Sequence, residues 1–481
     1  MSRLRALAAN MAAVITGKAA TAVVGLLTVV ALTRHLGPTG FGYYRTVLTY
    51  SAFAAVLADS GLYMVTLRQM SQPGVDAGRV LGNALPLRVL STASVLLAAA
   101  AVSWLTPYDS QVKWGTLIGA AIYTCLQTSD FLIAAFQSVL KQARNAIAEV
   151  TGAVVTLGVV TALALTHAGA LPMLGATLLG ASVALTISIR LVRRLVPFRP
   201  RFDLPLWREY LIAGLPLAGA QILGMAMLRG DSLLLSLFQP AAAVGLYGVP
   251  SKLFEVTTSV PYMLAGLMMP ALTASAAADR SAFSQQLGNT LDAAAAYGVG
   301  VVIALAPFAD RLLALICGER FAAGAPALVV ISFAVALAGL THVLRFTLVA
   351  CGEPRRVLMG DAVACACAFA AYFALIPRFS LLGAAAGTVV AEASAFIAML
   401  VGLLRAGRRL PSLVNPAKAI IAGALAALTM KYLAGIGTPW WLSLAAGGVL
   451  YLALVALTGA IPRELVLVAF SAARRTGVHH G

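Results

Sequence analysis

Charged residues are scarce in this chain. They make up 11% of its 481 residues, whereas hydrophobic residues make up 60% and the mean hydropathy is +0.91. A soluble domain usually carries about 25% charged residues, so this chain has too few polar side chains to cover itself in water. Its outer surface is therefore expected to face lipid. The composition excludes a cytosolic enzyme, a secreted disulfide scaffold, a disordered chain and a coiled coil.

A disulfide framework, histidine clusters and long polar loops are also lacking. The five cysteines form no disulfide framework. The five histidines form no cluster with the spacing of a metal site. No GxxxxGK[ST] motif occurs, and the longest loop, Arg190–Glu209, has about twenty residues. These absences leave no room for a soluble catalytic or nucleotide-binding domain, and we predict no enzyme activity, cofactor or metal.

Long apolar runs make up most of the sequence. A membrane-spanning helix needs about 20 apolar residues, and the runs predict an all-α polytopic membrane protein with about fourteen transmembrane helices. The predicted spans are roughly 9–33, 41–67, 80–103, 115–137, 146–167, 170–189, 210–238, 246–274, 287–308, 324–350, 357–377, 380–404, 415–435 and 439–461.

Basic residues outnumber acidic ones by 34 to 17, which gives a net charge of +17. With fourteen spans, 22 basic residues fall on the side that holds both termini and 6 on the opposite side. Lys and Arg concentrate in cytoplasmic loops, so we predict that both termini are cytoplasmic. The same rule accounts for the basic excess without nucleic acid as a partner.

Two short motifs suggest an internal duplication. Gly40-Phe41-Gly42-Tyr43-Tyr44 follows the first span, and Ala243-Val244-Gly245-Leu246-Tyr247 follows the seventh. Duplicated halves are common in transporters, with the substrate between them. We therefore predict two pseudo-symmetric six-helix lobes with a C-terminal helix pair. The predicted boundaries are 1–195 for the N-lobe, 196–209 for a basic cytoplasmic linker, 210–404 for the C-lobe, and 405–481 for the last two helices and a cytoplasmic tail.

Five cations lie inside predicted spans, where charge is costly and usually functional: Lys18, Arg45, Arg88, Arg229 and Arg345. Together they predict a positively charged cavity that binds an anionic substrate. Guanidinium groups suit phosphate because they donate paired hydrogen bonds. The alternative is that these groups only hold helices together.

Acidic residues in the spans have two readings. Asp59, Asp130 and Asp231 either balance the cations or serve as proton or cation coupling sites. In the second span, charges and hydroxyls share one helical stripe, which runs through Arg45, Thr49, Ala52, Val56, Asp59 and Tyr63. Lys252 and Glu255 are three apart on one helix, and we expect them to pair locally.

The first motif resembles a known signature. Arg34, Leu36-Gly37-Pro38, Phe41-Gly42 and Tyr44 match the pattern R-x-LGP-x-x-FG-x-Y of the polysaccharide-biosynthesis flippases. These are the Wzx-type lipid-linked oligosaccharide flippases of the multidrug/oligosaccharidyl-lipid/polysaccharide (MOP) exporter superfamily. Residues 228–234, 244–247 and 308–321 are similar to later parts of that family's pattern.

The resemblance implies a flippase that works by alternating access. Its substrate would be an oligosaccharide on undecaprenyl (pyro)phosphate, moved across the bacterial cytoplasmic membrane for surface polysaccharide synthesis. Its partners would be the lipid-linked oligosaccharide, membrane lipid, and polysaccharide polymerase and export proteins.

Two other functions stay open. A drug/cation antiporter of the same superfamily would have twelve spans and an acid-rich site. A membrane-embedded glycan polymerase or ligase would need a large external loop or an acidic metal motif, and the sequence contains neither.

Overall fold

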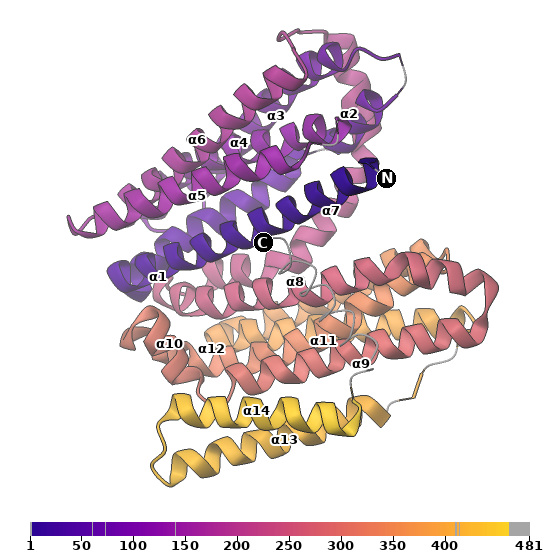
Figure 1. The fold of residues 1–481 in the computed structure, drawn as a ribbon. Coiled ribbons are helices and arrows are strands. Elements are labelled where there is room, and N and C mark those ends of the chain that lie inside the picture. Colours follow the sequence, from indigo (N-terminus) through magenta and orange to yellow (C-terminus); the bar gives the residue numbers. More distant parts are fainter. Residues whose placement is uncertain are drawn as a thin grey trace, which may run out of the picture. The chain divides into compact units, whose positions relative to one another are not determined.

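The computed structural model describes residues 2–59, 61–72, 74–139, 141–408, 411–412 and 414–460, and in these residues every regular element is helical (Figure 1). This confirms the predicted all-α fold class. The elements are α1 (Ser2–Asp59), α2 (Leu62–Met70), α3 (Ala77–Ser103), α4 (Ser110–Ser138), α5 (Ala143–Ala164), α6 (Ala170–Leu195), α7 (Leu204–Phe238), α8 (Ala241–Ala278), α9 (Arg280–Leu305), α10 (Ala309–Cys317), the 3₁₀ helix η1 (Glu319–Gly324), α11 (Ala325–Ala350), α12 (Pro354–Arg405), α13 (Val414–Gly435) and α14 (Trp440–Thr458).

Two of these helices are each a pair of helices joined at a break. Gly37 interrupts α1 with φ 63° and ψ −177°, a conformation that glycine tolerates and other residues avoid, and Pro38 follows it. Ser380 interrupts α12 with φ 51°. Beyond that break Gly383 contacts the carbonyl of Leu375, so the chain turns back on itself there.

The two breaks account for the number of membrane passes. Among the described residues, eleven helices are long and apolar enough to cross a membrane, with α1 and α12 counted once each. Counting each broken helix as two passes, and adding the 38-residue α8, gives a number close to the roughly fourteen passes that the apolar runs predict. The predicted separation of the fifth and sixth spans agrees with α5 and α6.

The second span is shorter than predicted. We expected one helix over residues 41–67, but α1 ends at Asp59 and α2 begins at Leu62. Gly61 causes the interruption, because its left-handed φ of 64° cannot continue a helix. Tyr63 therefore lies on α2, outside the stripe that begins at Arg45, and its hydroxyl donates to Gln137 on α4.

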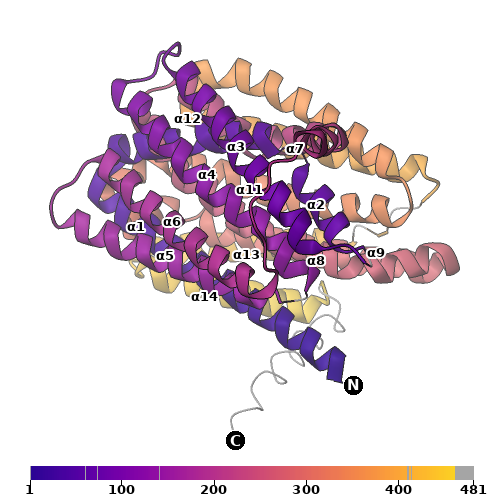
Figure 2. The ribbon, with the colours of Figure 1, turned by 90° about the horizontal axis from the view of Figure 1, so that it is seen from above.

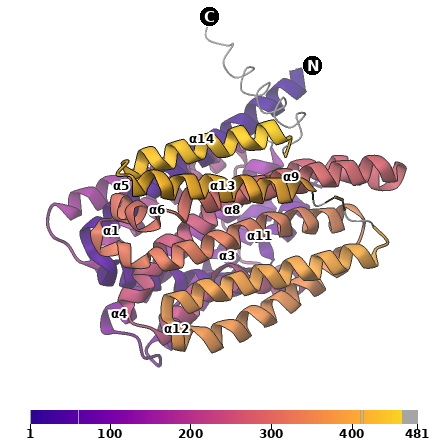
Figure 3. The same ribbon diagram turned by 90° about the horizontal axis from the view of Figure 1, so that it is seen from below.

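Packing divides the chain into two units. We call unit 1 residues 1–248 with 316–320, and unit 2 residues 249–315 with 321–481. In unit 1, α3 lies beside α4 and α5 lies beside α6 (Figure 2). In unit 2, α13 and α14 form an antiparallel pair against α9 (Figure 3). The lobe boundaries drawn from the sequence stay a prediction.

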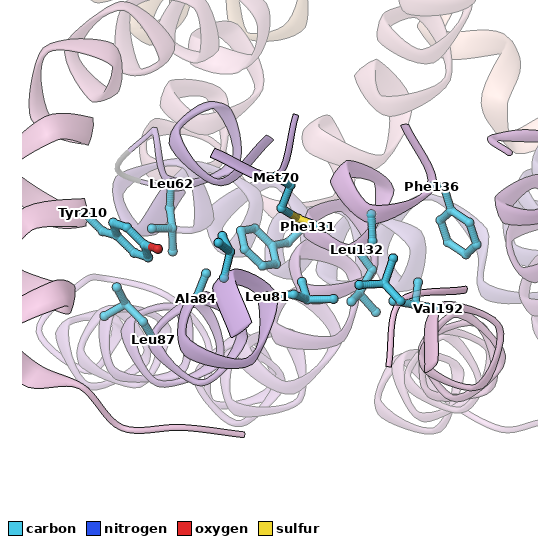
Figure 4. Close-up of a cluster of buried hydrophobic side chains, with 13 residues drawn as sticks. Leu62, Met70, Leu81, Ala84, Leu87, Phe131, Leu132, Phe136, Val192 and Tyr210 are labelled. Atoms are coloured by element: carbon cyan, nitrogen blue, oxygen red, sulfur yellow. The ribbon is translucent and has the colours of Figure 1, made fainter. Parts of the chain in front are cut away.

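Unit 1 has an apolar core where α2, α3, α4, α6 and α7 meet (Figure 4). Its largest members include Leu62, Leu81, Phe131, Phe136 and Tyr210, all 1% exposed or less. Tyr210 also donates from its hydroxyl to Gln69 at 2.6 Å, so its polar end is satisfied while its ring is buried.

Unit 2 packs through small residues. Gly298 of α9 contacts the backbone of Ala336 on α11, and Gly447 of α14 contacts Met430 on α13. Small residues allow helix backbones to approach closely, which drives association where lipid removes the hydrophobic effect between helices. Tyr451 adds a hydrogen bond of 2.6 Å to the carbonyl of Ala296, which ties α14 to α9.

The outward faces of the helices carry large apolar side chains. Leu457, Val449 and Leu428 are 65% exposed or more. A protein in water rarely exposes such continuous apolar surface. The chain is therefore a multi-pass membrane protein with a lipid-facing surface.

Candidate functional site

The two motifs that suggested a duplication pack against each other in unit 1. A side chain at Gly42, in the second half of α1, would strike the carbonyl of Ala241 at the start of α8. A side chain at Gly245 would likewise strike the carbonyl of Pro38. The missing side chains let the two backbones touch. Sequence reasoning found both motifs but gave no sign that they meet.

The tyrosine of the second motif leads to a buried carboxylate. Tyr247 on α8 donates to an oxygen of Asp231 on α7 at 2.6 Å, and the backbone N–H of Ser232 donates to the other oxygen. Asp231 is 6% exposed. A buried carboxylate needs such bonds and a cation, because its desolvation is otherwise costly.

Arg45 is the cation that acts electrostatically on Asp231. Its alkyl chain crosses Gly248 of α8, where an added Cβ would lie 3.3 Å from the arginine Cγ. Arg45 as a whole is half-buried. Asp231 and Tyr247 thus form a hydrogen-bonded pair that joins α7 and α8, and the stem of Arg45 on α1 lies beside Gly248, the residue after Tyr247.

The other predicted residues of unit 1 have varied surroundings. Lys18 is exposed on α1, and Arg229 is half-buried on α7, two residues before Asp231. Asp130 on α4 is exposed. The side chain of Asp59, the remaining candidate for coupling, lies outside the described residues.

A cavity of about 360 Å³ lies close to the crossing of the two motifs. Its lining includes Tyr43, Tyr108, Asp109 and Ser236. Tyr43 donates to Asp109 at 2.6 Å, and Tyr108 and Ser236 share a hydrogen bond of 2.8 Å. The loop between α3 and α4 therefore joins α1 and α7 around a pocket of aromatic and polar groups.

Arg88 lies in the interior of unit 1 rather than in an open cavity. It is 2% exposed, and its guanidinium donates to Gln127 at 3.1 Å. Gln127 in turn donates to the carbonyl of Ala55 at 3.2 Å. This chain of bonds links α3, α4 and α1, as expected of polar groups that hold helices together in a membrane.

Arg345 belongs to unit 2 and has a carboxylate partner. Its guanidinium pairs with Asp361 at 2.6 Å, and His342 lies 3.4 Å from its other terminal nitrogen. Glu392 also interacts electrostatically with both Arg345 and Asp361. This cluster joins α11 to both halves of α12. The sequence singled out Arg345 as an intramembrane cation but not its pair with Asp361.

The five cations are thus not equivalent. Arg88 and Arg345 are held by polar partners, whereas Lys18 is exposed and Arg45 and Arg229 are half-buried. The local Lys252–Glu255 pair, expected from its spacing, is confirmed at 3.2 Å. A role of any of these cations in phosphate binding stays a prediction.

The sequence as a whole matches a known family. Residues 7–276, more than half of the chain, match the polysaccharide biosynthesis proteins. The chain belongs to that family. A comparison of this chain with proteins of curated function finds no match.

Solved structures with the same fold are flippases and transporters. The lipid II flippase MurJ, in an inward closed conformation, superposes with a TM-score of 0.78 at 11% identity, over 94% of this chain and 100% of MurJ. An inward-facing multidrug resistance MATE transporter of the MOP superfamily superposes with a TM-score of 0.60 at 14% identity, over 80% of this chain and 94% of the transporter. A MATE transporter of Vibrio cholerae superposes with a TM-score of 0.53 at 13% identity, over 84% of this chain and 96% of the transporter. This family member therefore has the MOP superfamily fold.

Proposed function

We propose that this protein is a flippase for an oligosaccharide carried on undecaprenyl (pyro)phosphate. It would move this substrate across the bacterial cytoplasmic membrane by alternating access, in the synthesis of a surface polysaccharide. The observation that carries the proposal is the family match over residues 7–276. The fold shared with a lipid II flippase supports it.

The phosphates of the carrier would bind Arg45 and Arg229, with Lys18 close by. Arg88, which is 2% exposed, and Arg345, which pairs with Asp361 at 2.6 Å, are less suited to this role. A guanidinium in a site with little water binds phosphate through paired, charge-assisted hydrogen bonds. The glycan would travel with the phosphates while the prenyl tail stays in lipid.

The absence of a nucleotide motif leaves a membrane gradient, or the substrate gradient, as the energy source. Asp59, Asp130 and Asp231 are candidates for coupling a cation gradient. The Arg345–Asp361–Glu392 cluster is a further candidate, because it places two carboxylates beside one arginine inside the membrane. Polysaccharide polymerase and export proteins would be partners.

A drug/cation antiporter is the second candidate, since MATE transporters share the fold. The family match and the basic character of the intramembrane residues favour the flippase. A glycan polymerase or ligase has less support, because no loop is large enough to form a catalytic domain.

The deciding experiment measures glycan export in a deletion strain that carries variants of this protein. We expect Arg45→Ala and Arg229→Ala to lose export, since each removes a charge-assisted bond of about 1.5–3 kcal/mol. Arg45→Lys keeps the charge but loses the paired geometry, so it should retain part of the activity. Lys431→Ala, at an exposed position on α13, is the matched control. Export is divided by the amount of folded protein in the membrane.

The double variant Arg45→Ala/Asp231→Asn separates two roles of Arg45. If Arg45 binds phosphate, removing the charge of Asp231 should leave export lost. If Arg45 only neutralises Asp231, the double variant should recover both protein level and export. Wild-type export from well-folded Arg45→Ala and Arg229→Ala variants would contradict the phosphate role.

A further inference from the structure

A second basic site lies in unit 1, and none of the five intramembrane cations lines it. A cavity of about 610 Å³ opens where the connection between α6 and α7 passes the start of α3. Four arginines line it: Arg79 on α3, Arg193 on α6, and Arg199 and Arg201 on the connection. Asp76 is the one acidic residue in the lining.

The connection is held firmly against α3. The backbone N–H of Arg201 donates to the carbonyl of Gly82 at 2.8 Å, and the indole of Trp207 donates to the carbonyl of Asn83 at 3.0 Å. Side chains at Gly78 and Gly82 would strike the carbonyls of Pro197 and Arg199, so glycine is needed at both positions for this approach. The connection is therefore a fixed wall of the cavity.

Apolar packing anchors both ends of this wall. Val192 and Val196 belong to the buried core of unit 1, and Phe198 and Trp207 pack against it. Val192 appears at the edge of that core in Figure 4. Between these anchors, both Arg199 and Arg201 line the cavity.

The four arginines lack carboxylate partners. In the parts of the chain that the structure describes, their side chains form no ion pair with Asp or Glu. Asp76 uses one carboxylate oxygen to accept the backbone N–H groups of Gly78 and Arg79, which caps α3. Arg193 stacks over Phe198 at 5.4 Å, which fixes its position without neutralising it.

We propose that this four-arginine pocket binds a phosphate-bearing anion. Several guanidinium groups around one cavity suit a multiply charged hydrogen-bond acceptor such as a phosphate or diphosphate. Such an anion would relieve the mutual repulsion of the four cations. The proposal concerns a site separate from Arg45 and Arg229, and it does not rest on the transport function.

The phosphate has two possible sources, a lipid headgroup or a free phosphate compound. The surroundings favour the headgroup. Phe202 and Leu204, next to Arg201, are each 69% exposed, and the rings of Phe202 and Trp207 lie 5.8 Å apart. Exposed apolar and aromatic side chains beside basic ones are typical of the membrane–water interface. The charge count assigns this segment to the cytoplasmic side.

The test uses the full-length protein in nanodiscs of phosphatidylcholine and in neutral detergent, at low salt. One arm titrates inorganic pyrophosphate into the nanodiscs by calorimetry. The other arm titrates dihexanoyl phosphatidate into the detergent-solubilised protein, with dihexanoyl phosphatidylcholine as the neutral comparison. Binding of pyrophosphate alone identifies a free phosphate as the source, and binding of phosphatidate alone identifies a lipid headgroup; either result supports the site.

The variant Arg199→Gln/Arg201→Gln should weaken binding roughly tenfold or more, the effect expected from losing charge-assisted hydrogen bonds. The matched control is Arg190→Gln/Arg194→Gln, which removes the same charge from exposed positions at the same end of α6, outside the cavity. The control should change binding less than about twofold, because salt screens the effect of exposed charges that lie outside the cavity. If the double variant of the wall fails to fold, Arg79→Gln tests the same cavity.

Two results would overturn the proposal. One is that neither pyrophosphate nor phosphatidate binds to the wild-type protein. The other is that both pairs of substitutions weaken binding equally, which would mean general attraction to a basic surface. These measurements report binding alone, so their failure would not contradict the flippase proposal. Likewise, a failure of the export experiment would not contradict the proposed anion site.

Discussion

At the scale of single residues, the decisive question is which charges inside the membrane have a partner. Arg345 pairs with Asp361 at 2.6 Å, and the two side chains are 26% and 23% exposed. Arg88 is 2% exposed and donates to Gln127 at 3.1 Å. Arg45 acts on Asp231, which also accepts from Tyr247. Each cation therefore has its own electrostatic surroundings, and a shared basic composition does not make them one site.

The Arg345–Asp361 pair gives a stability prediction. Arg345→Gln should lower the free energy of unfolding by roughly 1–3 kcal/mol, less than the loss of a fully buried pair, since both side chains are partly exposed. Arg311→Gln is the control, because its pair with Asp310 is 65% and 59% exposed and should contribute within about 0.5 kcal/mol. Thermal unfolding of the purified protein, followed by fluorescence, measures both. Equal effects would show that the intramembrane pair is no stronger than the exposed one.

At the scale of helices, close backbone contacts and helix caps fix the arrangement. The crossing of α1 and α8 needs glycine at two positions, and the connection along α3 needs glycine at two more. Asp76, Asp203 and Asp279 accept backbone N–H groups at the starts of α3, α7 and α9. Such caps satisfy donors that have no partner within the helix.

The crossing of α1 and α8 gives a prediction about packing. Gly245→Ala should destabilise the protein by about 1–3 kcal/mol, because the methyl group would push against the carbonyl of Pro38 and neither backbone can yield alone. Gly224→Ala on α7 is the control: its Cβ would meet no atom within 4 Å, and alanine favours a helix by up to about 1 kcal/mol. Melting temperatures of the two purified variants should therefore shift in opposite directions, and a stable Gly245→Ala variant would contradict the close crossing.

The cap of α9 gives a prediction about pH. Hydrogen bonds from the hydroxyl and backbone N–H of Ser281 hold the pKa of Asp279 below its usual value. A carboxyl with a lowered folded pKa stabilises the fold above its unfolded pKa of about 4, and this contribution is lost as the pH falls through the folded value. Hydrogen exchange in the first turn of α9, corrected for intrinsic rates, should therefore accelerate between pH 6 and pH 3.

Asp279→Asn provides the comparison for that experiment, since asparagine also caps helices but does not titrate. Its first turn should show little change over the same pH range. Identical pH dependence in the two proteins would assign the effect to other carboxyl groups.

At the scale of the whole molecule, the distribution of basic residues predicts the orientation in the membrane. In a variant without the five native cysteines, Arg201→Cys should react only with a reagent that enters the cell, and Thr166→Cys should react with an impermeant one. Both positions are exposed and lie in connections, after α6 and between α5 and α6. Reaction of Arg201→Cys with the impermeant reagent would invert the predicted topology.

The sequence alone determined the helical membrane class, the long apolar spans and the family, because these depend on composition, run length and local motifs. It also predicted the Lys252–Glu255 pair, since three residues along a helix place both side chains on one face. Only the tertiary structure decided that Gly42 and Gly245 lie at one crossing, that Arg345 meets Asp361, and that four arginines surround one cavity. Those contacts join residues of different helices, so the apolar periodicity within one helix does not encode them. The same periodicity does not encode the positive φ angles at Gly37, Gly61 and Ser380, where helices are interrupted.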